Sequence, residues 1–227
     1  MIDKIQLTLY EFFGYLLPGS IGAVAIIIFY WSLCLPHTAL PLDKLHPDRL
    51  GWIILIGMCY LIGHLVQGLG TKYLKGAEQA ALGSIPLPIV LSAKSRAASI
   101  ADVDVEDIDP VSLFRLADEY TIQNGILGDR DIFVYREGFY KGCAVALALL
   151  SISLVIRSFL GTITLGFPSY TYDVSRHQIF VSALIIFLAA ILCKLRFHRF
   201  GVYRVSRALF AFITLATKDL ASQKNPK

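Results

Sequence analysis

The sequence predicts an all-α membrane protein: a polytopic four-helix transmembrane bundle with a small cytoplasmic helical segment and a C-terminal basic amphipathic helix. The chain has 227 residues, of which 56% are hydrophobic, whereas soluble domains have about 45–50% apolar residues. The excess lies in four stretches, residues 12–35, 51–69, 138–156 and 179–195. Each has about the 17–25 residues that a helix needs to cross a bilayer.

The distribution of basic residues predicts the orientation of these spans. Of the 21 Lys and Arg residues, only Lys44, Arg49, Arg157 and Arg176 fall in the loops at residues 36–50 and 157–177. The other basic residues lie at the N-terminus, in the central segment and in the tail. Because basic residues accumulate on the cytoplasmic side of short loops and span ends, we expect both termini and the central segment to be cytoplasmic.

This orientation divides the chain into four parts. Residues 1–69 form an N-terminal transmembrane hairpin, and residues 70–137 form a cytoplasmic segment. Residues 138–195 form a second transmembrane hairpin, and residues 196–227 form a cytoplasmic basic amphipathic tail.

Small residues and a proline mark the packing faces of two spans. Gly19 and Ala23, and likewise Ala144 and Ala148, are four residues apart, which places each pair on one helical face and permits a close helix approach. Pro18 lacks a backbone N–H and is expected to kink the first span.

The second span carries the most polar stripe, at Tyr60, His64 and Gln67. Their i, i+4, i+7 spacing places them on one face. Polar groups in spans tend to face a bundle interior or an aqueous cavity, so the stripe is a candidate pore lining, proton-sensitive gate or ligand contact. The alternative is an interhelical hydrogen bond near the cytoplasmic end. The absence of Asp and Glu from the span centres argues against an ion-coupled transporter.

The central segment contains one clear helix start. Asp109 and Pro110 fit the N-cap and first position of a helix, which Asn124 and Gly125 should end. The expected apolar stripe is Leu113, Leu116, Ala117 and Tyr120.

Two other parts of the central segment carry weaker signals of secondary structure. We expect residues 72–82 to extend the second span as a short helix. The apolar run at residues 85–91 contains Pro86 and Pro88, so it is expected not to form a regular helix and to pack on the membrane surface or on a neighbouring chain.

Charged residues suggest where lipid and partners bind. Arg130, Arg136 and Lys141 lie among acidic residues before the third span and suit either a salt-bridged collar or a site for a cytoplasmic partner or ligand. Arg157 is expected to reach the outer headgroups. The tail is expected either to lie on anionic lipid or to pack against the central segment; its headgroup candidates are Arg196, Arg199, Arg204 and Arg207.

Motifs for catalysis and for metal binding are missing from the sequence. A calcium loop counted from Asp102 would need Gly at its sixth position and Glu at its twelfth, where the chain has Asp107 and Leu113. No nucleophile elbow, zinc-protease helix or phosphate-binding loop is present. We therefore expect no enzyme activity, cofactor or metal, and no direct nucleic-acid binding. A lipid-acting membrane enzyme would need two or more acids clustered in space with a histidine or a bound metal.

Two segments carry a resemblance to a group of known proteins. The segment Tyr10-Glu11-Phe12-Phe13-Gly14-Tyr15-Leu16-Leu17-Pro18-Gly19 and the Gly-His-x-x-Gln pattern at residues 63–67 resemble small uncharacterised bacterial four-span membrane proteins. Some of these are anti-phage defence components that act as membrane anchors or membrane-disrupting effectors.

The resemblance implies a non-enzymatic, multi-pass protein of the bacterial inner membrane. It would be a homo-oligomer that contacts the lipid bilayer and works with a cytoplasmic protein partner, as an anchor or as a pore-forming effector in antiviral defence. The alternative is a small-solute channel or transporter lined by the polar face of the second span.

Overall fold

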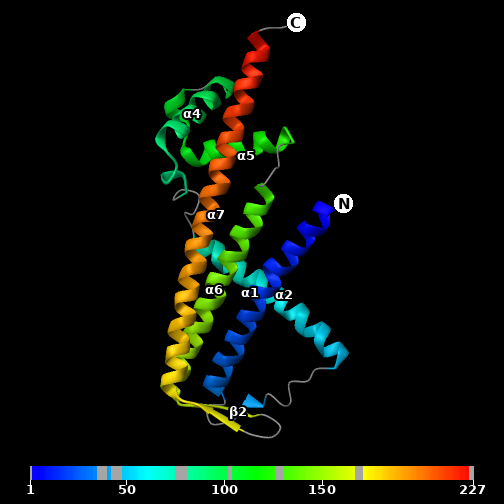
Figure 1. The fold of residues 1–227 in the computed structure, drawn as a ribbon, viewed down its shortest axis with the longest axis vertical. Coiled ribbons are helices and arrows are strands. Elements are labelled where there is room, and N and C mark those ends of the chain that lie inside the picture. The colour runs from blue at the N-terminus through cyan, green and yellow to red at the C-terminus, as the bar shows by residue number, and fades with distance from the viewer. Residues whose placement is uncertain are drawn as a thin grey trace. The chain divides into compact units, whose positions relative to one another are not determined.

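The computed structural model describes residues 2–34, 40–41, 48–74, 81–101, 104–125, 130–166 and 171–224. This part of the chain is mostly helical, as predicted. Its longer elements are α1 (Ile2–Cys34), α2 (Arg49–Tyr73), α4 (Leu87–Ala101), α5 (Pro110–Gln123), α6 (Arg130–Leu160) and α7 (Arg176–Lys224), shown in Figure 1.

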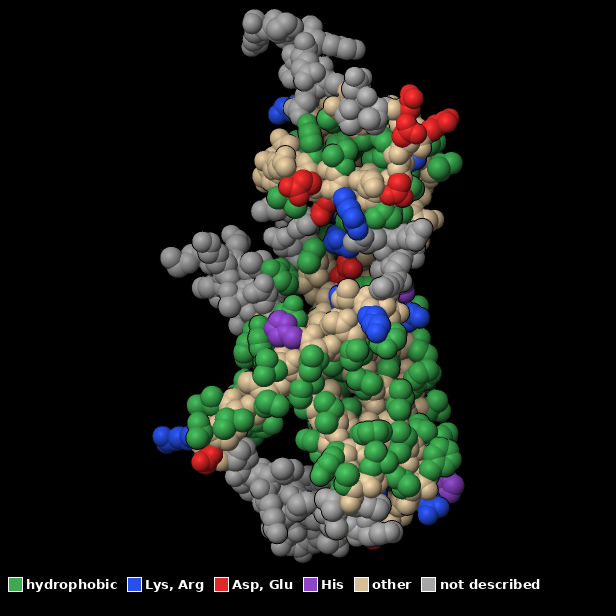
Figure 2. All heavy atoms as spheres, turned by 180° about the vertical axis from the view of Figure 1, so that it is seen from behind, with side chains coloured by type: hydrophobic (Ala, Val, Ile, Leu, Met, Phe, Trp, Pro, Cys, Tyr) green, Lys and Arg blue, Asp and Glu red, His purple; other side chains and the backbone are tan. Residues whose placement is uncertain are grey.

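Within the described residues, four helices are long and apolar enough to cross a membrane. The candidate spans are Gly14–Cys34, Arg49–Tyr73, Ile132–Leu160 and a segment within Arg176–Lys218. Much of their apolar surface faces outward, and Figure 2 shows hydrophobic side chains crowded over these helices. Soluble proteins rarely expose so much apolar surface. The four exposed apolar helices therefore support a membrane protein with the predicted number of spans.

The chain forms two compact units. Unit 1 comprises Met1–Lys75 and Gly138–Leu195, and unit 2 comprises Gly76–Glu137 and Arg196–Lys227. Helices α6 and α7 each contribute residues to both units.

Unit 1 also contains a small sheet that the sequence analysis did not predict. Strand β1 (Leu40–Pro41) pairs in parallel with β2 (Ile163–Gly166), and β2 pairs antiparallel with β3 (Thr171–Val174). The strands belong to the loops at residues 36–50 and 157–177, for which no strand was predicted. Ile163 packs in a cluster with Trp31, Leu154, Ile179 and Ala183, which fixes β2 against the helix ends.

Unit 2 has its own hydrophobic core between α4, α5 and the second part of α7. The fully buried members include Ala93, Ala97, Leu113, Ala117, Val205, Leu209 and Phe212. The tail therefore packs against the central segment, which was one of the two predicted alternatives. Helix α7 also continues through Gly201 without a break.

The start of α4 corrects the expectation for the proline-rich run. Helix α4 begins at Leu87 and contains Pro88 in its first turn, where the missing N–H would have no intrahelical partner in any case. The carbonyl of Pro86 accepts a hydrogen bond from the N–H of Ile89 at 3.0 Å. Ile85 packs into the core of unit 2.

Helix α5 begins and ends as predicted. The Asp109 carboxylate caps it by accepting from the backbone N–H of Ser112 at 2.9 Å, and Gly125 follows its end with φ +71°. The buried face differs in two positions, because Phe114 is buried in place of Leu116 and Thr121 in place of Tyr120, which is half-buried. Helix α2 ends at Tyr73, so part of the expected extension at 72–82 falls at residues 75–80, outside the described residues.

Candidate functional site

Helices α1 and α2 cross at two glycines that have no room for a side chain. A Cβ atom at Gly19 would collide with the carbonyl oxygen of Cys59 and lie 2.7 Å from the nitrogen of Gly63. A Cβ atom at Gly63 would collide with the carbonyl of Tyr15. The close approach expected at Gly19 is therefore present, and Gly63 is its counterpart on α2.

Gln67 joins three helices at a junction that we define by Gly14, Pro18, Gln67, Gly138 and Gly142. Its Nε2 donates to the carbonyl of Gly14 on α1 at 3.3 Å and to the carbonyl of Gly138 on α6 at 2.8 Å. In an α-helix the carbonyl of Gly14 would accept from residue 18, but Pro18 has no N–H. Gln67 therefore supplies a donor that the proline removes.

The same junction explains two glycines of α6 that the sequence analysis did not single out. A Cβ atom at Gly142 would lie 3.1 Å from Pro18 and 3.2 Å from Nε2 of Gln67. Gly138 offers its carbonyl to the same amide. The Gly-x-x-x-Gly spacing was the available signal, since it is typical of close helix contacts in membranes.

Tyr60 and His64 lie apart from this junction, in a cluster of aromatic rings. The His64 ring stacks on Tyr15 with centroids 4.0 Å apart and meets Tyr60 edge-on at 4.7 Å. His64 remains exposed beside these rings. The predicted stripe is thus divided: Gln67 forms interhelical hydrogen bonds, while Tyr60 and His64 lie with Tyr15 at the surface of unit 1.

Two of the three candidate partner-binding cations are described, and they belong to different units. Lys141 belongs to unit 1, where its Nζ donates to Thr71 Oγ1 at 3.0 Å. Arg136 belongs to unit 2, where its guanidinium lies 5.6 Å from the ring centroid of Phe200. The side chain of Arg130 is outside the described part of the structure.

Among the four predicted headgroup arginines, Arg204 has a different role. Its Nε donates to the Glu137 carboxylate at 2.8 Å, and the two side chains are only 13% and 15% exposed. The guanidinium also lies 5.0 Å from the ring of Phe114. Its charge is paired inside unit 2, where the side chain is largely buried. Arg196, Arg199 and Arg207 are exposed.

The expectation that Arg157 extends to the outer headgroups is wrong. The residue is 2% exposed, and its Nη2 donates to the carbonyl of Thr162 at 2.6 Å. Its guanidinium lies 5.5 Å from the Trp31 ring. The carbonyl is within reach because Gly161, with φ +145°, turns the chain back after α6.

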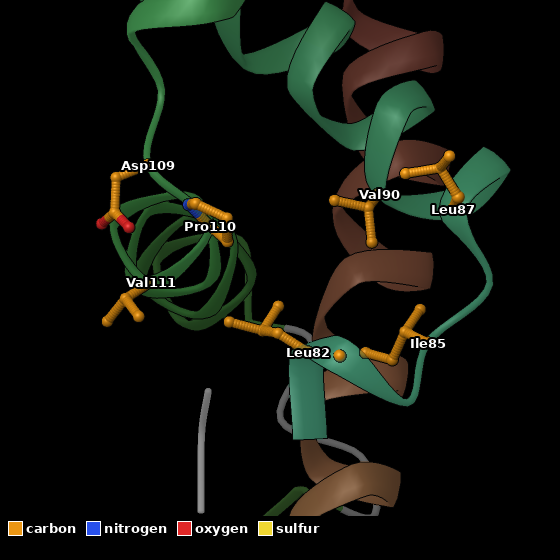
Figure 3. A pocket seen from close by; sticks show the side chains of 8 residues that line it. Leu82, Ile85, Leu87, Val90, Asp109, Pro110 and Val111 are labelled. Carbon is orange, nitrogen blue, oxygen red and sulfur yellow. The ribbon is translucent and has the colours of Figure 1, made fainter. Parts of the chain in front are cut away.

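Unit 2 has an open apolar pocket of about 410 Å³ where α4 and α5 begin (Figure 3). Asp109 is the charged residue of its lining. The lining residues are Leu82, Gly83, Ile85, Leu87, Val90, Asp109, Pro110 and Val111. The sequence did not predict this pocket. The one hint was the proline-rich apolar run at residues 85–91, which supplies part of the lining.

Neither the geometry nor similarity to other proteins assigns a chemistry. Among the described residues, no group of three or more His, Cys, Asp or Glu side chains is placed to hold a metal ion. No family model, curated protein or solved structure matches this chain.

Proposed function

We propose that this chain is a non-enzymatic anchor in the bacterial inner membrane, whose unit 2 holds a protein partner at the cytoplasmic face. The pocket of unit 2 carries the proposal. A self-contained helical core with an open apolar pocket of about 410 Å³ is suited to receive an apolar side chain of another protein, because buried apolar anchors supply most of the energy of such contacts.

The charges of the chain support a cytoplasmic position for unit 2. Arg196, Arg199 and Arg207 are exposed on the part of α7 that belongs to this unit. Basic residues next to spans favour the cytoplasmic side and are attracted to its anionic lipids. With an even number of spans, both termini are then cytoplasmic.

The contacts of the polar stripe favour the anchor over a pore-forming effector or a solute channel. Gln67 is bonded between α1, α2 and α6, and His64 packs on Tyr15. A role in antiviral defence rests on the resemblance of residues 10–19 and 63–67 alone.

Partner capture tests the proposal. The tagged chain is purified from its native host as wild type, as Leu87→Glu at the rim of the pocket, and as Ile100→Glu, an exposed control on α4 outside the pocket lining. We expect one protein to be enriched with wild type and with the control, and to fall about tenfold with Leu87→Glu, since loss of an interface anchor commonly costs more than 1.4 kcal/mol. Equal recovery with all three forms would contradict the proposal.

A permeability assay separates the anchor from the pore. Liposomes that contain the purified chain and the captured partner should retain an entrapped dye as well as empty liposomes do. Release of the dye would instead support the pore-forming effector.

A further inference from the structure

Two arginines from different helices of unit 2 flank a group of three aromatic rings. The rings of Phe133 on α6 and of Phe200 and Tyr203 on α7 have centroids 5.9–6.3 Å apart. The guanidinium of Arg136 lies 5.6 Å from the Phe200 centroid, and that of Arg199 lies 5.4 Å from the Tyr203 centroid. We call these five residues the cation–aromatic cluster. It joins two cations that the sequence analysis assigned to separate roles.

The two guanidinium groups of the cluster keep donors for a ligand. Nε of Arg199 donates to the Tyr203 hydroxyl at 2.8 Å, which orients the group and leaves its two terminal nitrogens. Arg136 and Arg199 are both exposed. Among the described residues, neither has a carboxylate partner, because Glu137, the acid next to Arg136, pairs with Arg204. The cluster therefore presents two positive charges that the described part of unit 2 does not neutralise.

Both arginines lie at the depth of lipid headgroups. Residues 142–156 of α6 and 178–193 of α7 contain no Asp, Glu, Lys or Arg. Arg136 and Arg199 each lie about 13–14 residues from the middle of the nearer stretch, which is about 20 Å along a helix. The headgroup region of a bilayer extends from about 15 to about 22 Å from the midplane. By the same measure Arg207 lies about 32 Å away, beyond the headgroups.

A lipid phosphate suits two guanidinium groups at this depth. The planar donors of arginine match phosphate oxygens in geometry and in charge, and tyrosine favours the membrane interface. An anionic headgroup has no cation of its own, whereas the choline of a zwitterionic headgroup would be repelled by the two arginines. We propose that the cation–aromatic cluster binds the phosphate of an anionic phospholipid. This site requires the chain to span a membrane, but it does not require a protein partner in the pocket of unit 2.

Lipid binding to the purified chain tests the proposal. The chain is kept in a non-ionic detergent, which removes the general charge of a membrane surface. Native mass spectrometry then counts the lipids bound as phosphatidylglycerol or phosphatidylcholine is titrated. We expect one phosphatidylglycerol per chain to bind more tightly than phosphatidylcholine. Arg136→Gln and Arg199→Gln should each weaken this binding about fivefold, since a basic residue near an anionic lipid surface contributes about 1 kcal/mol.

The matched control is Arg207→Gln, which removes the same charge from α7 beyond the headgroups and should leave the binding unchanged. Unaltered thermal unfolding of the three variants would show that unit 2 still folds. An equal loss with Arg207→Gln, wild-type binding by Arg136→Gln or Arg199→Gln, or equal affinity of the wild-type chain for the two lipids would overturn the site.

Inorganic phosphate distinguishes a lipid site from a site for free phosphate. At millimolar concentration it should not displace the bound phosphatidylglycerol. Displacement would make free phosphate the ligand and would overturn the lipid assignment. Partner capture by the pocket of unit 2 can succeed or fail independently of all these results.

Discussion

Some glycines of α2 lie where a side chain would collide with a neighbouring helix, and others lie where a side chain would meet no described atom. Gly63→Ala would drive a methyl group into the backbone of Tyr15. We expect a loss of about 1–3 kcal/mol in the free energy of unfolding, as for other overpacked sites, measured by thermal unfolding in detergent.

The control for this prediction is Gly57→Ala on the same helix. No described atom surrounds a Cβ at Gly57, so alanine should be neutral or should stabilise the helix by up to about 1 kcal/mol. Equal destabilisation by the two substitutions would mean that the α1–α2 crossing is not at Gly63.

The pairing of Gln67 with the carbonyl freed by Pro18 predicts an energetic coupling between the two residues. Gln67→Leu removes the donor to Gly14 and to Gly138 and should cost about 1–2 kcal/mol. In a Pro18→Ala background, a backbone N–H is restored at position 18, so Gln67→Leu should cost less. A double-mutant cycle measures the coupling; strictly additive effects would contradict it.

The spacing of Tyr60, His64 and Gln67 was sufficient to place them on one side of α2, but it did not show what each side chain contacts. Gln67 turns to the junction because Gly138 and Gly142 allow α6 to approach. That approach depends on residues about 71 positions away in sequence, which helical periodicity does not encode.

At the scale of single elements, the cap of α5 predicts a pH effect. Hydrogen bonds from the backbone and hydroxyl of Ser112 lower the pKa of Asp109 below its usual range. A lowered pKa means that the cap stabilises the fold above the unfolded-state pKa, about 3.9. This contribution is lost as the pH falls through the native value.

Asp109→Ala should therefore lower the melting temperature at pH 7, and the difference from wild type should shrink below about pH 4. Circular dichroism at a series of pH values measures it. Asp107→Ala is the control, because Asp107 lies in the neighbouring turn η2 (Val105–Asp107) and does not cap α5. A difference that persists at the lowest pH would argue against the cap.

The ion pair in unit 2 predicts that the part of α7 in this unit is fixed by charge as well as by its apolar face. Arg204→Met removes the guanidinium that pairs with the partly buried Glu137 carboxylate and should destabilise unit 2 by about 1.5–3 kcal/mol. Arg207→Met, at an exposed position of the same helix, should change stability by less than about 0.5 kcal/mol. Urea unfolding of both variants measures the difference, and similar values would contradict a structural role for the pair.

Helix starts were predictable where the capping residue stands next to the helix, as Asp109 does before α5. The start of α4 was not predictable. Pro88 is tolerated in the first turn of a helix but not in its interior, and the sequence did not show in which of the two it lies. Gly201 lies inside α7, although glycine is unfavourable in a helix interior. The long helix α7 continues through it because Val205, Leu209 and Phe212 beyond it are buried in unit 2.

At the scale of the whole molecule, composition and span length predicted the mostly helical fold and its four candidate spans. The strands β1, β2 and β3 were not predictable, because β1 is only two residues long and pairs with residues about 125 positions away. Packing of the tail against the central segment was predicted only as one of two alternatives, since the core of unit 2 joins the central segment to a tail that follows 58 residues of spans and loops.

The most direct test of the proposed anchor is the side of the membrane on which unit 2 lies. Single cysteines are introduced by Arg115→Cys on α5 and by Tyr172→Cys on β3, both exposed, and intact spheroplasts are treated with a membrane-impermeant maleimide. The account predicts labelling of Tyr172→Cys in intact spheroplasts and of Arg115→Cys only after the membrane is permeabilised. Labelling of Arg115→Cys in intact spheroplasts would place unit 2 outside the cell and contradict the account.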